Sequence, residues 1–579
     1  MPPHTPVAPP TVLPADVDAL RADLRAARYL SEHVEELLGP VAAAALRRED
    51  AVPARRALRT ITDPAGTLLG VFTLGATVTR ERLDEVLPTL GAAGAERLGI
   101  VGPAGERADG DAAGGDAACG DAADGGTQRL RALIDLAPYA AEDDRGSVTW
   151  WIASDLSELA TDAPLHPAHV LGVGGASLTL ARITPRAEVG RVLDVGCGGG
   201  IQALHASRHA AHVVATDLSE RALAFAAFNA ALNGVELELR QGSLLEPAAG
   251  ETFDLIVSNP PFVITPRAAD EDRDAWTYRD GGRAGDALLG ELLADLPAHL
   301  APGGTAVMLG NWEITGAPET VAEDSQEGAP GSGSTEGRSA EDRSAWDAHP
   351  RAWLEAASAG GVDAWVIQRE QEDPAEYAGT WARDGGITVR DPEWPALVGA
   401  WLDDFASRDV AAIGFGYVLL HRPAGAADGS SLVDGSGPAD EAGRRRGVLR
   451  TESATGTGSG TLAEHLAASL AAINLLEDLD DEALLAARPV RASDVMERRH
   501  LTPGEWDPVL IELVQGRGLA RAVRADQALA ATVGALDGTL TLGQVIAAVC
   551  ALTDADVDET RERLLPIVRE LVITGMVTL

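Results

Sequence analysis

The sequence contains no lysine, few aromatic residues and little positive charge. All 47 basic residues are arginines, and 88 acidic residues outnumber them, so the formal net charge is −41. This balance disfavours a generally basic surface for nucleic acid, although a local arginine patch stays compatible with it. We interpret the absence of lysine, together with the many alanines and glycines, as coding bias rather than as a functional signal.

Cysteine is also scarce, and long hydrophobic runs are missing. Cys119, Cys197 and Cys550 are far apart and form no CxxC pair, and the histidines show no metal-ligand spacing. A disulfide framework and a zinc site are therefore not expected. The first residues lack the charged and apolar regions of a secretory signal, and no run approaches the roughly 20 apolar residues of a membrane span. These absences predict a cytoplasmic protein without a metal or a membrane segment.

Hydrophobic residues make up 45% of the 579-residue chain, which is enough for several buried cores. The composition changes along the chain and suggests separate domains. We expect a helix near Leu130–Leu136, followed by a strand at 148–152. The predicted organisation is a disordered tail (1–12), an N-terminal helical or winged-helix-like domain (13–160, with a disordered insertion at 102–127), an α/β domain (161–422, with a disordered insertion at 316–345), a linker (423–460) and a C-terminal winged-helix-like domain (461–579).

Short apolar runs alternate with helical segments in the central domain. Such alternation predicts a parallel sheet covered by helices on both faces. The expected strands lie at 191–195, 212–216, 236–241, 253–257, 304–309, 362–368 and 412–421. The predicted fold class is therefore α/β, with a seven-stranded Rossmann-like sheet between an N-terminal helical or α+β domain and a C-terminal winged-helix-like domain.

The first of these strands runs directly into a glycine-rich segment, residues 196–200 (GCGGG), and Asp194 precedes it. Glycines allow a tight turn and the close approach of a ligand, and ligands of open α/β sheets bind at the carboxyl ends of the strands. The second strand ends in Asp217, where a carboxylate accepts hydrogen bonds from ribose hydroxyls. Together these residues predict a nucleoside cofactor. The alternative is that Asp217 only caps the following helix.

The fourth expected strand ends in Asn259-Pro260-Pro261-Phe262. Prolines end a strand because they cannot donate a hydrogen bond to the sheet. A polar amide, a rigid turn and an aromatic ring together suggest a device that holds a small, flat, polar group. The alternative is a turn with no function beyond ending the strand.

The order of these motifs resembles that of the class I S-adenosylmethionine-dependent methyltransferases, across roughly residues 165–422. The longer run NPPFVITPR, followed by Tyr278–Gly285 (YRDGGRAG), is similar to the HemK-like enzymes of the methyltransferase small domain type, which methylate a glutamine side chain in translation release factors. Residues 172–177 (GVGGAS) depart from that pattern and are closer to ribosomal-RNA methyltransferases. The resemblance implies S-adenosylmethionine as the cofactor, with Asp194, Gly196, Gly198, Gly200, Asp217, Ser243 and Asn259 as its binding residues.

The resemblance also implies roles for Asn259, Pro260 and Phe262 in catalysis. An amide or aromatic amine nitrogen is a poor nucleophile because its lone pair is delocalised. The Asn259 side-chain oxygen and the Pro260 carbonyl would each accept one N–H, and Phe262 would stack on the flat group. The two prolines would hold this arrangement rigid, so catalysis would be chiefly positioning.

The implied function is therefore nitrogen methylation of a macromolecule, most narrowly of a protein glutamine side chain. The alternative is nucleic acid binding and methylation of a base amino group in ribosomal or transfer RNA. A more remote alternative is a binding module that no longer catalyses. The expected partner is a translation protein or an RNA, which the flanking domains would recruit, and the oligomeric state is left open.

Overall fold

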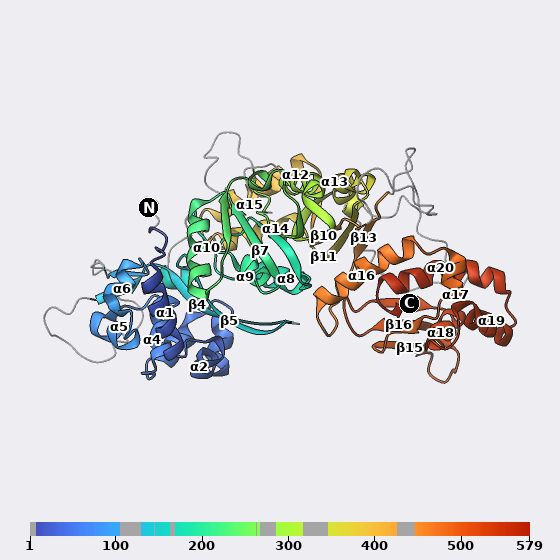
Figure 1. The fold of residues 1–579 in the computed structure, drawn as a ribbon, viewed down its shortest axis with the longest axis horizontal. Helices are drawn as coiled ribbons and strands as arrows, with labels where there is room; N and C mark the ends of the chain where they lie inside the picture. Colours follow the sequence, from blue (N-terminus) through green and yellow to red (C-terminus); the bar gives the residue numbers. More distant parts are fainter. Residues whose placement is uncertain are drawn as a thin grey trace. The chain divides into compact units, whose positions relative to one another are not determined.

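The computed structural model describes residues 7–104, 129–143, 145–161, 168–261, 263–266, 285–316, 345–424 and 446–579 (Figure 1). The insertions predicted at 102–127 and 316–345 fall almost entirely outside the described residues. The chain divides into two compact units. The first comprises residues 1–181, 188–288 and 374–407, and the second comprises residues 182–187, 289–373 and 408–579.

The central feature is an eight-stranded sheet with the order β13-β11-β12-β10-β9-β6-β7-β8. Its strands are β6 (Val189–Val195), β7 (Ala210–Asp217), β8 (Glu238–Gln241), β9 (Phe253–Ser258), β10 (Leu300–Thr315), β11 (Asp363–Glu372), β12 (Val410–His421) and β13 (Leu449–Ser453). The α/β class is confirmed, and all seven predicted strands are present. The predicted count and the all-parallel arrangement are wrong, because an eighth strand is added and β12 runs antiparallel to β10 and β11.

The eighth strand, β13, lies inside the segment predicted as a linker. Its sequence, LRTES, contains a single apolar residue, so no apolar run marks it as a strand. It pairs in parallel with β11. The Arg450 guanidinium lies 5.6 Å from the centre of the Trp365 ring and forms ion pairs with Glu452 and Glu570. Ion pairs and a cation–π contact therefore hold this edge of the sheet. The hydrophobic pattern of the sequence does not predict a strand here.

Helices fill the connections between the strands. They are α8 (Gly175–Ile183), α9 (Ile201–Ala206), α10 (Glu220–Asn233), α12 (Ala287–Asp295), α13 (Ala348–Ala359), α14 (Pro374–Asp384) and α15 (Trp394–Ser407). The limits of α10 follow from its caps. Ser219 accepts a hydrogen bond from the Ala222 N–H at the start, and Gly234 ends the helix in the left-handed region with φ 70°.

The N-terminal part is helical with two small β structures. Its elements are α1 (Pro14–Ala26), α2 (Ser31–Leu46), α3 (Ala51–Leu58), α4 (Pro64–Phe72), α5 (Arg80–Val86), α6 (Gly91–Arg97) and α7 (Glu158–Thr161), the sheet β1 (Val78–Thr79), β3 (Arg129–Ala132), β2 (Val101–Pro103), and the hairpin β4 (Asp135–Asp143), β5 (Gly146–Ser154). The helix predicted near Leu130–Leu136 is wrong. Leu130, Ala132, Ile134 and Leu136 are buried at every second position, which is the period of a strand.

The core of the N-terminal part continues into α10. Phe225, Phe228 and Leu232 of this helix are fully buried in the same hydrophobic cluster as Leu20 and Leu24 of α1. Figure 1 shows α10 beside the β4–β5 hairpin, in agreement with the hydrogen bonds between them. The N-terminal helices and α10 therefore share one hydrophobic cluster.

The C-terminal part combines helices with a three-stranded antiparallel sheet, β15-β16-β17. Its elements are α16 (Leu462–Glu477), α17 (Asp481–Ala486), β14 (Val490–Arg491), β15 (Val495–Leu501), β16 (Pro508–Gln515), β17 (Ala522–Ala525), α18 (Gln527–Gly534), α19 (Leu542–Thr553), α20 (Val557–Ile573) and β18 (Val577–Thr578). Its assignment as winged-helix-like stays a prediction. Among the helices that the structure describes, none has the length and apolar character needed to cross a membrane.

Candidate functional site

The glycine-rich loop leaves the sheet at the carboxyl end of β6. Gly196, Gly198 and Gly200 all have positive φ angles of 70°, 53° and 83°, which other residues adopt only with strain. Among the described residues, no atom lies within 4 Å of a Cβ built at Gly196 or Gly198, whereas a Cβ at Gly200 would lie 3.2 Å from the Ala226 Cβ of α10. The first two glycines therefore border open space, and the third is needed for packing.

The end of β7 holds this loop through hydrogen bonds. The N–H groups of Gly196 and Cys197 both donate to the Thr216 carbonyl over 2.9 Å. Asp217 accepts from the Gly198 N–H over 2.9 Å and from the Ser219 N–H over 2.8 Å. Burial raises the pKa of the Asp217 carboxyl. Ser219 is the residue that caps α10. The Asp217 carboxylate lies directly against the glycine loop, so its role is not limited to capping a helix.

Asp194 lies within β6 and is 1% exposed. Its Oδ2 accepts a hydrogen bond from the Ala203 N–H of α9 over 2.9 Å. Burial raises the pKa of this carboxyl to about 7, and the nearby charge of Asp217 adds to the rise. Asp194 thus ties α9 to the sheet below the loop, and its predicted contact with a cofactor stays a prediction.

Asn259 follows β9, the neighbour of β6 in the sheet. The two strands are parallel, Val195 pairs with Ser258, and the Ser258 hydroxyl donates to the Val195 carbonyl over 2.8 Å. Gly196 and Asn259 therefore leave the sheet at the same edge, from strands about 4.8 Å apart. The Asn259 Oδ1 atom is buried and has no hydrogen-bond partner within the described part of the chain.

An orphaned acceptor of this kind costs about 1–3 kcal/mol, so it calls for an explanation. The atom lies at the end of β9, next to the strand that carries the glycine loop. Its predicted role as acceptor of a substrate N–H stays a prediction. Pro260, the next residue, is buried. Phe262 lies outside the described residues, so its stacking role stays a prediction.

The segment after Phe262 is held by two aromatic side chains that the sequence analysis missed. The Ile264 N–H donates to the Tyr377 hydroxyl over 2.9 Å, and the Ile264 carbonyl accepts from the Trp401 indole N–H over 2.7 Å. Tyr377 and Trp401 belong to α14 and α15, which connect β11 to β12, and both are buried. Both polar groups of one backbone residue are thereby fixed close to the NPPF motif.

Ser243 lies in the turn after β8 and is partly buried. The neighbouring Gly242 N–H donates to the Asp217 carbonyl over 3.1 Å, so this turn is tied to the end of β7. Leu218, which follows Asp217, is 57% exposed. The ends of β7 and β8 thus combine a carboxylate, a hydroxyl and an apolar side chain, although contact of Ser243 with a cofactor stays a prediction.

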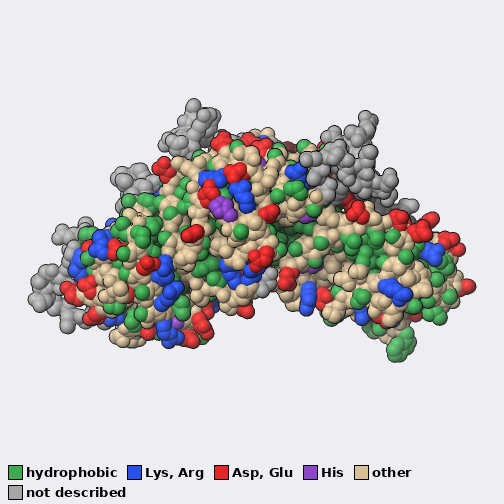
Figure 2. Space-filling view, in the orientation of Figure 1, with side chains coloured by type: hydrophobic (Ala, Val, Ile, Leu, Met, Phe, Trp, Pro, Cys, Tyr) green, Lys and Arg blue, Asp and Glu red, His purple; other side chains and the backbone are tan. Residues whose placement is uncertain are grey.

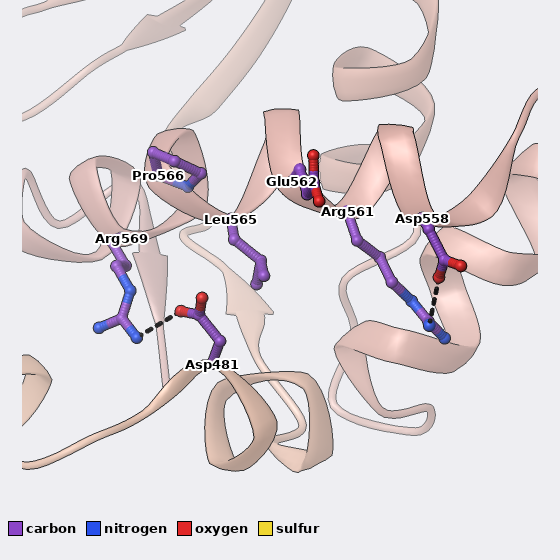
Figure 3. Close-up of a pocket in the computed structure, with 7 residues that line it drawn as sticks. All are labelled: Asp481, Asp558, Arg561, Glu562, Leu565, Pro566 and Arg569. Carbon is purple, nitrogen blue, oxygen red and sulfur yellow. Dashed lines mark hydrogen bonds and ion pairs between the residues drawn. The ribbon is translucent and has the colours of Figure 1, made fainter. Parts of the chain in front are cut away.

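A hollow of about 670 Å³ lies between α17 and α20 (Figure 3). Figure 3 shows Arg569 paired with Asp481 and Arg561 paired with Asp558, whereas Glu562 forms no pair with the other residues drawn. None of the predicted site residues lines this hollow. Across the described ranges, no group of three His, Cys, Asp or Glu side chains is arranged to hold a metal ion.

Comparison with known proteins identifies three families in the chain. Residues 172–273 match the methyltransferase small domain, which contains the glycine loop, Asp217 and Asn259. Residues 26–113 match a domain of unknown function, DUF7059, and residues 468–579 match another, DUF7782. The first match confirms the resemblance of the central part to S-adenosylmethionine-dependent methyltransferases.

Several curated relatives match about a fifth of the chain. The chain is 42% identical to the release factor glutamine methyltransferase of Deinococcus radiodurans over 21% of this chain and 46% of the relative. It is 36% identical to the ribosomal protein uL3 glutamine methyltransferase of Bradyrhizobium diazoefficiens, over 20% and 39%. It is 30% identical to the ribosomal RNA small subunit methyltransferase C of Alcanivorax borkumensis, over 22% and 33%. The chain thus spans less than half the length of these relatives.

Among solved structures, a 16S rRNA methyltransferase of T. thermophilus in complex with AdoMet and guanosine matches with 18% identity and a TM-score of 0.23. The match covers 41% of this chain and 55% of that one.

Proposed function

We propose that this protein is an S-adenosylmethionine-dependent methyltransferase that methylates a planar amide nitrogen of a macromolecule, most narrowly a glutamine side chain of a translation protein. The observation that carries the proposal is the buried Oδ1 of Asn259, which has no hydrogen-bond partner among the described residues and lies at the edge of the sheet that also bears the glycine loop. A carboxamide NH₂ group is a donor that suits this acceptor.

The residues of the loop fit the cofactor. Gly196 and Gly198 border open space that a Cβ would enter, so the backbone there accepts a closely packed ligand. Each oxygen of Asp217 accepts one hydrogen bond in this structure and has a further lone pair for a ribose hydroxyl. When bound, S-adenosylmethionine supplies an activated methyl group on a sulfonium centre.

The chain's own contribution to the reaction is to hold the acceptor. The Asn259 oxygen would accept one N–H of the substrate amide, and the Pro260 carbonyl would accept the other. These two hydrogen bonds would turn the nitrogen lone pair toward the methyl donor. The gain comes from positioning. The methylated nitrogen would then lose one N–H proton to water, so no strong base would be needed before the transfer.

Two lines favour a protein substrate. The relatives from Deinococcus radiodurans and Bradyrhizobium diazoefficiens are both glutamine methyltransferases. The net charge of −41 also disfavours a polyanionic substrate, and the face seen in Figure 2 carries acidic and arginine side chains side by side.

A base amino group of RNA is the second candidate. It is favoured by the relative from Alcanivorax borkumensis, a ribosomal RNA methyltransferase, and by the Gly- and Ser-rich stretch at 172–177. An adenine or guanine amino group would present the same two N–H donors to Asn259 and Pro260.

The decisive experiment transfers labelled methyl groups to cell extract. The full-length protein is incubated with methyl-radiolabelled S-adenosylmethionine and extract, and the products are treated with protease or with ribonuclease. We expect protease to remove the label from the macromolecular fraction and ribonuclease to leave it. Removal by ribonuclease alone would select the RNA alternative, and no transfer in any fraction would contradict the methyltransferase proposal.

A further inference from the structure

The β5 strand of the N-terminal hairpin runs along α10. Side-chain amides of α10 bind the backbone N–H and carbonyl groups of β5, as the backbone of a neighbouring strand would. Asn233 accepts from the Trp151 N–H over 3.0 Å and donates to the Trp151 carbonyl over 2.8 Å. Asn229, one turn earlier, accepts from the Ala153 N–H over 2.7 Å and donates to the Ala153 carbonyl over 3.0 Å. Two side-chain amides that lie four residues apart on the helix thus satisfy the backbone N–H and carbonyl groups of two residues that lie two apart on the strand.

The contacts between α10 and the hairpin continue just after the end of β5. Arg221, near the start of α10, donates from Nε to the Asp155 carboxylate over 2.8 Å and forms a second bond through Nη2. Asp155 also accepts from the Val170 N–H over 2.8 Å. The hairpin is therefore fixed along most of α10, from Asn233 back to Arg221.

Asn229 differs from Asn233 in one contact. Its Nδ2 also donates to the Gly199 carbonyl over 2.8 Å, within the glycine loop. Asn229 is fully buried, as is Ala153, so these bonds are shielded from water. Its amide therefore connects the backbone of β5 to the backbone of the loop that is proposed to hold the cofactor.

The bond from Asn229 to the Gly199 carbonyl constrains the loop between Gly198, which borders open space, and Gly200, which is packed against α10. The Gly199 carbonyl belongs to the peptide that precedes Gly200, and the Gly200 N–H donates back to the Cys197 carbonyl over 2.8 Å. On the other side, the Gly198 N–H is held by Asp217. Asn229 thus completes a set of bonds that fixes consecutive peptides of the loop, which is preorganisation for a ligand.

We propose that the β4–β5 hairpin is an integral part of the cofactor site, and that Asn229 is the positioning residue that joins the two. The inference rests on the proposed function, since it assigns the loop to S-adenosylmethionine. It gives the N-terminal part a role in cofactor affinity, in addition to the substrate recruitment expected from its sequence.

The test compares Asn229→Ala with Asn233→Ala in the full-length protein. Each variant loses two side-chain hydrogen bonds to β5 and a third bond, which goes to the Gly199 carbonyl from Asn229 and to the Asn229 carbonyl from Asn233, so only Asn229→Ala frees the glycine loop. Calorimetry with S-adenosylmethionine should show affinity about tenfold weaker in Asn229→Ala and nearly unchanged in Asn233→Ala, with similar losses in Tm. Equal affinity in the two variants would overturn the inference. A wild-type protein that does not bind the cofactor would overturn the proposed function as well.

A second measurement needs no variant, so it stays informative if Asn229→Ala does not fold. Amide hydrogen exchange of the wild-type protein is followed with and without S-adenosylmethionine. Exchange should slow in the loop at 196–201 and also in β5 around Ala153. Protection of the loop with unchanged exchange in β5 would contradict the coupling.

Discussion

The glycines of one loop have different tasks, although the sequence presents them as a uniform run. Gly196 and Gly198 border open space, while Gly200 packs against Ala226. All three adopt positive φ angles, so each is constrained by backbone conformation. At the residue scale, then, the space around each Cα separates glycines that leave room for a ligand from a glycine that is needed for packing.

This distinction predicts different effects of two alanine substitutions. Gly198→Ala and Gly200→Ala should each cost about 1–2 kcal/mol in the free energy of unfolding through left-handed strain. Gly200→Ala should cost more, because its methyl group crowds Ala226. Gly198→Ala should instead weaken cofactor affinity, because its methyl group enters the open space above the loop.

Chemical denaturation and calorimetry with S-adenosylmethionine measure these two effects separately. Equal cofactor affinity in Gly198→Ala and the wild type would show that the space beside Gly198 is not the cofactor cradle.

The buried carboxyl of Asp194 makes stability depend on pH. Its pKa is about 7 in the folded protein because of burial, against 3.8 ordinarily. At pH values between these two pKa values, the folded protein holds a proton that the unfolded chain has released. The contribution of the Asp194 carboxyl to stability is therefore present below pH 4 and is lost as the pH rises toward 7. Asp194→Asn keeps an acceptor for the Ala203 N–H and removes the titration.

The wild-type free energy of unfolding, measured by urea at several pH values, should therefore fall relative to that of Asp194→Asn by a few kcal/mol between about pH 4 and 8. A difference that stays constant over this range would show that the Asp194 carboxyl ionises in the folded protein as it does in the unfolded chain.

At the scale of elements, the α14–α15 pair is the least expected part of the site. These helices lie between β11 and β12 in the sequence, yet Tyr377 and Trp401 bind the backbone next to the NPPF motif. Nothing in their sequence marks them as site residues, because buried aromatic side chains are ordinarily core. Their side-chain polar atoms give them a second task, which is to fix the Ile264 peptide groups.

Tyr377→Phe removes one hydroxyl and leaves the packing nearly unchanged, but it frees the Ile264 N–H. We expect kcat to fall about fivefold, since one hydrogen bond is worth about 1 kcal/mol, while cofactor affinity is retained. Trp381→Phe, on the same helix, is a control for general loosening of α14.

Steady-state kinetics with the identified substrate provides the measurement. Wild-type kcat in Tyr377→Phe, or an equal fall in the control variant, would remove the positioning role.

Elements with a strong apolar pattern were predictable, and elements held by polar contacts were not. The seven predicted strands carry apolar runs, and the positions of the glycine loop, Asp217 and Asn259 at strand ends follow from them. The β13 strand has a polar sequence and depends on Arg450, so its pattern resembled a linker. Asn229 lies in an alanine-rich segment and has no role in the sequence analysis, although two asparagines four residues apart in such a helix are a signal for a buried polar partner.

At the scale of the whole molecule, the boundary expected at residue 160 does not separate two cores. The α10 side chains Phe225, Phe228 and Leu232 pack with the N-terminal helices, and β5 supplies hydrogen-bond partners to Asn229 and Asn233. A fragment of residues 161–424 would expose these groups and would also lack β13.

We therefore expect the 161–424 fragment to lose its cooperative thermal transition and its affinity for S-adenosylmethionine. Circular dichroism and calorimetry on the fragment and on the full chain check this. A fragment that unfolds cooperatively and binds the cofactor as tightly as the full chain would show that the N-terminal part is dispensable for the site.

The most direct test of the proposed function concerns the unpartnered oxygen of Asn259. Asn259→Ala removes this acceptor without touching the glycine loop or Asp217. Methyl transfer measured with labelled S-adenosylmethionine should fall by on the order of 100-fold or more, while calorimetry should give a cofactor affinity close to that of the wild type. Turnover at the wild-type rate, or a collapse of cofactor binding in this variant, would contradict the role of Asn259 as the clamp on the acceptor nitrogen.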